Sequence, residues 1–184
     1  MIRLYGVASL AQNLCWALLS GLAVIGFAVS AQQPPLQPGK PVQFQISKLA
    51  AHDGNEILLQ DGSRWRTNMQ HFGLPDTPLV IYGSNLRSGS NSLMLNGFSL
   101  SANYKAGELH ARSGFQLTLL QVSADGKRLL LTDNLAASVL DSDRSFTRNW
   151  AANNDVILSA DFRTLLHLPS LQQVAVHISL TKAP

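Results

Sequence analysis

Histidine can bind a transition metal or act as a general base, so the five histidines are the first residues to test for chemistry. No two of them stand two positions apart, as on one face of a strand, or four positions apart, as on one face of a helix. A zinc site built within one element needs such spacing. We therefore predict no metal site and no cofactor, and we expect surface or structural roles for His52, His71, His110, His167 and His177.

The acidic and nucleophilic residues carry no catalytic signature. Asp141-Ser142-Asp143 begins like a calcium loop, but Phe146 stands at the sixth place, where such a loop needs glycine. The Gly-x-Ser-x-Gly motif of serine hydrolases does not occur, and Cys15 lies in an N-terminal stretch that we expect to be removed. The 11 acidic residues are scattered singly, so the sequence leaves open a pair of carboxylates that converge in space, as in a glycosidase.

Three residues are candidates for a binding surface: Arg64, Arg148 and Trp150. Arg64 has no obvious partner in the hairpin that contains it. Arg148 and Trp150 share one face of a predicted strand, and an exposed tryptophan beside an arginine would suit a carbohydrate. The alternative for Trp150 is burial in a β core with its indole N–H hydrogen-bonded, which is the commoner environment of tryptophan.

Apolar residues recur with a period of two along most of the chain. Near the C-terminus, Val174, Val176, Ile178 and Leu180 share one face, a pattern typical of half-buried antiparallel strands. About eleven such strands predict an all-β fold, an antiparallel sandwich or small barrel built from hairpins. Residues 163–170 are expected to form a helical turn that Pro169 ends. The expected strands are 42–48, 56–60, 63–67, 78–83, 92–95, 98–104, 108–113, 115–123, 128–133, a hairpin of 144–150 with 156–162, and 173–181.

An Asn-Gly pair at 96–97 predicts the register of one hairpin, because this pair favours a type I′ turn. A two-residue loop there pairs Leu95 with Phe98 and Leu93 with Leu100. All four apolar side chains then share one face, so turn chemistry and side-chain pattern agree.

A second hairpin turns at residues 60–62. A three-residue loop with Gly62 in the left-handed position pairs Ile57 with Trp65 and Glu56 with Arg66. Trp65 then points inward, and Glu56 forms a cross-strand ion pair with Arg66 on the outer face.

A third turn, at residues 125–126, is less regular. A two-residue loop pairs Val122 with Leu129 and Leu120 with Leu131. The leucine doublet at 119–120 interrupts the alternation, which predicts either a β-bulge or a strand buried on both faces.

The N-terminus has the layout of a secretory signal peptide, residues 1–31. It holds one positive residue, Arg3, then an apolar stretch, then small residues at Val29 and Ala31, after which we expect cleavage. An uncleaved membrane anchor is the alternative, because residues 4–31 are uncharged and long enough to span a bilayer. Residues 32–41 hold four prolines and are expected to form an extended leader to a single β domain, residues 42–184.

Net charge and cysteine content limit the classes of partner and the cellular compartment that we expect. The formal net charge is only +3, without a concentrated basic face, so we expect no nucleic-acid binding. Beyond the predicted signal peptide the chain has neither a cysteine nor an Asn-x-Ser/Thr site, which is typical of a periplasmic or secreted bacterial protein.

The sequence therefore predicts an exported, non-catalytic β-domain protein, an accessory or binding module of the bacterial cell envelope whose partner is a protein or glycan of the envelope. One alternative is a small secreted or periplasmic hydrolase acting on envelope polymers. The other is a membrane-tethered subunit of an envelope assembly, if residues 1–31 are retained.

Overall fold

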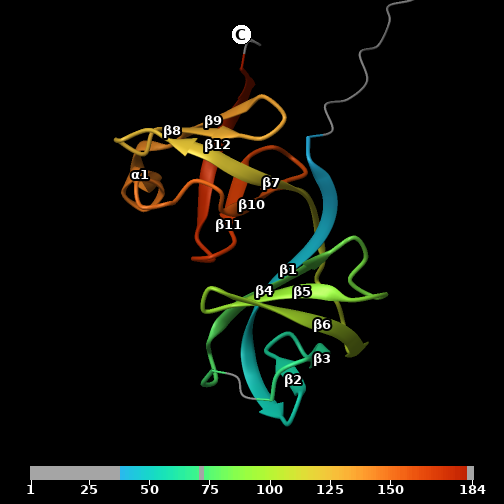
Figure 1. The fold of residues 1–184 in the computed structure, drawn as a ribbon. Helices are drawn as coiled ribbons and strands as arrows, with labels where there is room; N and C mark the ends of the chain where they lie inside the picture. The colour runs from blue at the N-terminus through green and yellow to red at the C-terminus, as the bar shows by residue number, and fades with distance from the viewer. Residues whose placement is uncertain (1–37, 71–72, 182–184) are drawn as a thin grey trace, which may run out of the picture. The chain divides into compact units, whose positions relative to one another are not determined.

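The computed structural model describes residues 38–70 and 73–181, which belong to one compact unit built almost entirely of β-strands (Figure 1). The described residues contain a single 3-10 turn, Asp141–Asp143, and directly after it a short helix, α1, Arg144–Thr147. The strands are Lys40–Asp53 (β1), Glu56–Leu59 (β2), Arg64–Thr67 (β3), Pro78–Gly83 (β4), Asn91–Leu95 (β5), Phe98–Ala106 (β6), Arg112–Val122 (β7), Arg128–Leu131 (β8), Leu135–Val139 (β9), Asp155–Ser159 (β10), Thr164–His167 (β11) and Gln173–Leu180 (β12).

The N-terminal predictions fall mostly on residues that the structure does not describe. The predicted signal peptide, residues 1–31, and residues 32–37 of the predicted leader lie outside the described residues. The first strand begins at Lys40, within the predicted leader. Across 38–70 and 73–181, no helix has the length and apolar character needed to cross a bilayer.

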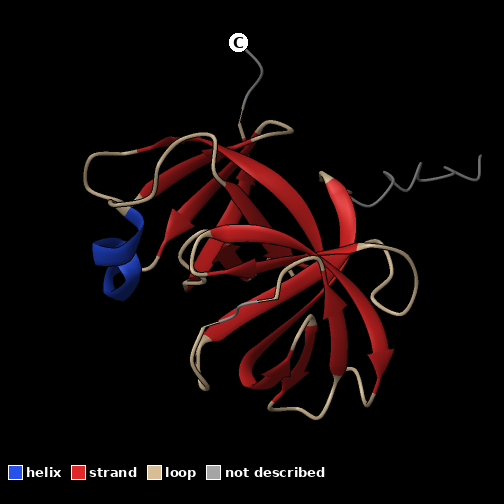
Figure 2. Ribbon diagram, turned by 60° about the horizontal axis from the view of Figure 1, so that its bottom comes forward, coloured by secondary structure: helices blue, strands red, loops and turns tan. Residues whose placement is uncertain are grey.

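The strands close into two barrels of the same topology (Figure 2). The first barrel has the order β1-β2-β3-β6-β5-β4, and β4 pairs back with β1. The second barrel has the order β7-β8-β9-β12-β11-β10, and β10 pairs back with β7. The second half of the domain therefore repeats the first, strand for strand. The predicted all-β fold is confirmed, and its architecture is a barrel rather than a sandwich.

The two barrels are joined where β1 runs antiparallel to β7, which we call the seam. Lys40–Phe44 pairs there with Arg112–Gln116, and Val42 lies opposite Gly114. Beyond the seam each strand bends into its own barrel at a shift of register, before Ala51 in β1 and before Gln121 in β7. A β-bulge bends a strand and increases its twist, as barrel closure requires.

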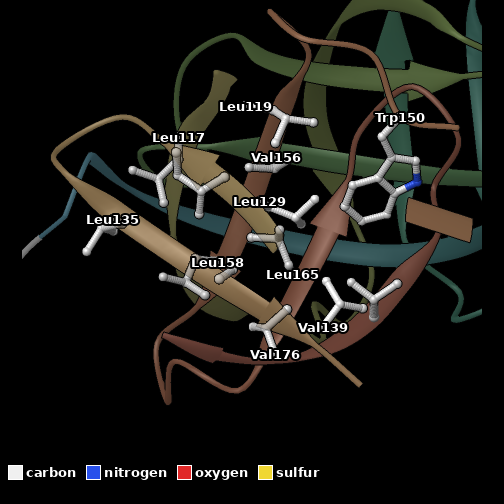
Figure 3. Close-up of a cluster of buried hydrophobic side chains, with 13 residues drawn as sticks. Leu117, Leu119, Leu129, Leu135, Val139, Trp150, Val156, Leu158, Leu165 and Val176 are labelled. Atoms are coloured by element: carbon white, nitrogen blue, oxygen red, sulfur yellow. The ribbon is translucent and has the colours of Figure 1, made fainter. Parts of the chain in front are cut away.

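Three buried apolar clusters follow from this arrangement. The first barrel encloses a core around Trp65 and Leu93, and the second barrel encloses one around Leu129 and Trp150 (Figure 3). A third cluster, which we call the seam core, lies between strands of both barrels. It consists of Val42, Phe44, Val80, Tyr82, Met94, Ile157, Leu166 and Leu168.

The two hairpin registers predicted from turn chemistry are confirmed. At the Asn-Gly turn, Leu95 pairs with Phe98 and Leu93 with Leu100. At the second turn, Ile57 pairs with Trp65, and the Glu56–Arg66 ion pair on the outer face has an N···O distance of 2.9 Å.

The third turn is confirmed only in part. Val122 pairs with Leu129, and the predicted bulge is present because the register shifts between Leu119 and Gln121. The bulge moves Leu119, not Leu120, opposite Leu131.

Several predicted elements are wrong. Residues 144–150 form no strand; the segment begins with α1 and continues as a turn. Residues 163–170 contain β11 rather than a helical turn, since Thr164–His167 pairs with both β10 and β12. The two strands expected within 108–123 are one strand, β7. In β7 and β11, long-range strand pairing overrides the local pattern.

Candidate ligand-binding groove

A groove beside the seam combines an apolar floor with a polar rim. It has a volume of about 300 Å³, at the lower end of the range for small-ligand sites. Strands of both barrels contribute to it: β1 from the first, and β7, β10, β11 and β12 from the second. We call it the seam groove. Its lining consists of Phe44, Arg112, Ser113, Ile157, Ser159, Ala160, Asp161, Thr164, Leu166 and Gln173.

The floor of the seam groove is rigid because it is part of the seam core. Phe44, Ile157 and Leu166 are almost fully buried and belong to that cluster. The strands of Phe44 and Ile157 both pair with β7 at Gly114, which lies opposite Val42 in β1 and opposite Ser159 in β10. A fixed apolar floor of this kind needs no rearrangement to receive a ligand.

One end of the rim is a tight turn, Ser159-Ala160-Asp161, between β10 and β11. Asp161 Oδ1 accepts hydrogen bonds from Ser159 Oγ at 2.5 Å and from the Arg163 N–H at 3.1 Å. These two bonds, the serine bond first, hold the pKa of Asp161 below its usual value. The carboxylate is therefore ionised at neutral pH, and no protein group among the described residues donates to Oδ2.

The same turn recurs between β7 and β8 as Ser123-Ala124-Asp125. There Asp125 accepts from Ser123 Oγ at 2.7 Å and from the Lys127 N–H at 3.0 Å. The repeated Ser-Ala-Asp sequence is visible in the chain and would have drawn attention to Asp161, which sequence reasoning missed.

Arg112, at the start of β7, supplies the positive charge of the seam groove. Its side chain is exposed and has no hydrogen-bond or ion-pair partner within residues 38–70 and 73–181. The two ion pairs that the described part contains are Arg66 with Glu56 and Arg144 with Asp141. Arg112 and Asp161 thus line one groove without neutralising each other.

The three binding residues predicted from sequence lie apart from this groove. Trp150 is only 5 % exposed, and its Nε1–H donates to Gln172 Oε1 at 3.1 Å. Arg148 is exposed directly after α1. Arg64 lines a different cavity, on the first barrel. The structure brings none of the three together.

The cavity that contains Arg64 lies next to the bulge in β1. It measures about 260 Å³, and His52, Asp53 and Glu56 also line it. Glu56 forms an ion pair with Arg66, whereas the side chain of Arg64 has no ion-pair or hydrogen-bond partner within the described ranges. A cavity of about 360 Å³ lies at the corresponding bulge of the second barrel, lined in part by Arg128.

His167 is the one buried histidine among the described residues, and its network is structural. The ring stacks on Trp150, with centroids 4.4 Å apart. Nε2 meets the Asn154 side-chain amide at 2.9 Å and Nδ1 meets Ser170 Oγ at 2.7 Å. Ser170 Oγ lies 3.2 Å from Gln172 Oε1, so a tautomer that carries the proton on Nδ1 and donates it to Ser170 satisfies every partner in this network.

The burial of His167 makes a prediction about pH. Burial lowers the pKa of His167 from its usual 6.5 to about 4. Between these two pH values the folded protein therefore binds fewer protons at His167 than the unfolded chain does. The contribution of His167 to the free energy of unfolding is fully present above pH 6.5 and is lost as the pH falls toward 4. Urea unfolding should show a loss of at most about 3 kcal/mol over this window. The His167→Gln variant should lose most of that pH dependence, and an unchanged slope would contradict the assignment.

No group of three or more histidine, cysteine or acidic side chains within the described part is arranged to hold a metal ion. Comparison of the chain with protein-family models, with curated proteins and with solved structures finds no match. The function must therefore be argued from the geometry alone.

Proposed function

We propose that this protein is exported to the periplasm or beyond, where it serves as a non-catalytic accessory or binding module of the bacterial cell envelope. The seam groove is its binding surface, and a protein or glycan of the envelope is its partner. The observation that carries the proposal is a concave, preformed groove with an apolar floor and a polar rim at the junction of two barrels, the kind of place where ligands bind.

Because the barrels are closed, a groove is a better candidate for the binding element than an edge strand is. Within the described residues every strand has a neighbour on each side, because each barrel closes on itself. Addition of a partner strand needs a free sheet edge, which closed barrels lack.

The chemistry of the groove supports binding over catalysis. One carboxylate, Asp161, lines it, and no histidine does. General acid–base hydrolysis of an envelope polymer needs two titratable groups that face the same bond. The groove offers only one.

Closing the groove tests the proposal. Ser113→Trp places a bulky side chain on the rim at an exposed strand position, and Ser138→Trp places the same side chain at an exposed position of β9, outside the groove. The full exported chain should be retained on an isolated bacterial envelope fraction, and Ser113→Trp alone should abolish the retention. Equal retention of both variants would contradict the groove as the binding surface.

A hydrolase remains the second proposal because the cavity at the β1 bulge combines His52 with two acidic side chains, Asp53 and Glu56. We expect no release of soluble fragments from purified envelope polymer by the wild-type protein. If the wild-type protein releases fragments and the Asp53→Asn and Glu56→Gln variants do not, that cavity is the active site of a hydrolase.

The mature N-terminus provides a further prediction. Edman sequencing of the protein exported from a bacterial host should begin at Gln32, since cleavage is expected after Ala31. A chain that begins at Met1 and sediments with membranes would instead support the tethered subunit.

A further inference from the structure

The seam groove has the charge pattern of a site for a molecule that carries both a carboxylate and N–H donors. Arg112 presents a guanidinium that no described residue neutralises. A guanidinium matches a carboxylate with two parallel N–H···O bonds, which makes it the preferred protein group for that anion. An anion beside Arg112 would gain a partner without displacing one.

Asp161 provides the complementary acceptor. Its Oδ1 is occupied by Ser159 and by the Arg163 N–H, so the carboxylate is fixed in one orientation. Oδ2 is left to accept from a ligand. Because a fixed acceptor and an unpaired guanidinium line one groove, they favour a ligand that carries both a negative group and N–H donors.

Uncommitted polar side chains also line the seam groove. Ser113, Thr164 and Gln173 line the groove, and their side chains form no hydrogen bond among the described residues. Hydroxyl and carboxamide groups both donate and accept, as pairing with peptide N–H and C=O groups requires. The apolar floor beneath them suits an apolar side chain.

The aromatic residues argue against a sugar in this groove. Sugar binding through stacking needs an exposed aromatic face. The groove holds one aromatic residue, Phe44, which is 4 % exposed, and the tryptophans Trp65 and Trp150 are buried in the barrels. The hydrogen-bonding rim and the apolar floor fit a peptide better.

We infer that the seam groove binds the C-terminal end of a peptide, with Arg112 holding the terminal carboxylate, Asp161 accepting a backbone N–H, and an apolar side chain on the floor of Phe44, Ile157 and Leu166. The volume of about 300 Å³ admits the last residues of a chain but not a folded partner. This inference rests on the proposed function and names the chemistry of its ligand.

Fluorescence anisotropy with a short labelled peptide tests the inference. The probe is fluorescein-Gly-Ser-Gly-Ala-Leu with a free carboxylate, compared with the same peptide ending in a carboxamide. The wild-type chain should bind the acid at least about ten-fold more tightly than the amide, the loss expected for a charge-assisted pair. Arg112→Gln should weaken binding of the acid by a similar factor and remove the preference. Asp161→Asn keeps an oxygen for the turn and should weaken both peptides.

The repeated turn supplies matched controls. Asp125→Asn changes the same Ser-Ala-Asp turn between β7 and β8, and Arg128→Gln removes an exposed arginine from another cavity. Both should bind the probe like the wild-type protein. Equal affinity for acid and amide, no binding of either, or an unchanged Arg112→Gln variant would overturn the peptide assignment. Suppose that the peptide assignment is overturned. If Ser113→Trp nevertheless abolishes retention on the envelope, the groove is still the binding surface and only the class of ligand is wrong. If Ser113→Trp is retained, the proposed function is wrong as well.

Discussion

Trp65→Ala should lower the free energy of unfolding by about 3–5 kcal/mol, the range for removing a fully buried large aromatic side chain. Trp65 has no exposed surface, and its ring meets that of Tyr104 edge to face, with the ring centroids 5.5 Å apart. Its Nε1–H donates to the buried Ser63 hydroxyl at 3.0 Å. The substitution therefore opens a cavity in the first barrel and also removes a donor from Ser63.

Trp65→Ala also weakens a hydrogen-bond network, because Ser63 is bonded to further residues. Ser63 Oγ donates to Asp61 and accepts from Gln45 Nε2, and Gln45 Oε1 accepts the His110 N–H. Trp65→Phe should keep most of the packing and lose about 1 kcal/mol for the hydrogen bond. Phe98→Ala is the control, because Phe98 is 70 % exposed on the same barrel and should change stability by less than about 0.5 kcal/mol. Urea unfolding measures all three, and equal losses for Trp65→Ala and Phe98→Ala would contradict the inward position of Trp65.

Gly114→Val should destabilise the protein by about 3 kcal/mol or more, because Gly114 stands where β1, β7 and β10 meet. A Cβ at this position would lie 2.6 Å from the Leu158 carbonyl oxygen and 3.1 Å from Phe44 Cε1. The carbonyl belongs to backbone and cannot swing away. The strands at the seam must separate, which disturbs the floor of the groove as well.

The neighbouring residue is the matched control. Ser113 is exposed on the same strand, so Ser113→Val should be neutral within about 0.5 kcal/mol. Thermal unfolding compares the two variants at the same strand pairing. A stable Gly114→Val protein would show that the strands at the seam lie further apart than described.

Local chemistry predicted the hairpins well. The Asn-Gly pair at 96–97 and the loop at 60–62 each combine a demanding turn conformation with a matching apolar face, so register follows from short-range physics. The bulge after Leu119 was equally visible, because a leucine doublet cannot alternate.

Long-range pairing could not be predicted in this way. Gln45 alternates with Phe44 and Ile46 and reads as an outward polar residue, yet it is 1 % exposed. The reason is that β1 serves two cores: Phe44 faces the seam core, while Gln45 bonds to Ser63 beside the core of the first barrel. Nothing in a local window shows that a strand will be shared between two barrels.

The candidate groove was missed for the same reason. Arg112 and Asp161 come together only because β7 pairs with β1 on one side and with β10 on the other. Trp150 drew attention instead, since its alternation with Arg148 imitates a strand, whereas Arg144–Thr147 begins the segment as a helix and Trp150 ends in the core. Arg64 and Arg148 are exposed, whereas Trp150 is buried because the segment that holds it is not the strand that its alternation predicts.

Site-specific photo-crosslinking tests the central claim, that the seam groove is where this protein binds the envelope. The full chain, expressed in a bacterium with its N-terminal segment, would carry Gln173→benzoylphenylalanine, which replaces an already long, exposed side chain of the groove, or Ser138→benzoylphenylalanine on β9 as the control. Irradiation should give a covalent adduct with an envelope component from position 173 and none from position 138. Adducts of equal yield from both positions, or from position 138 alone, would contradict the account.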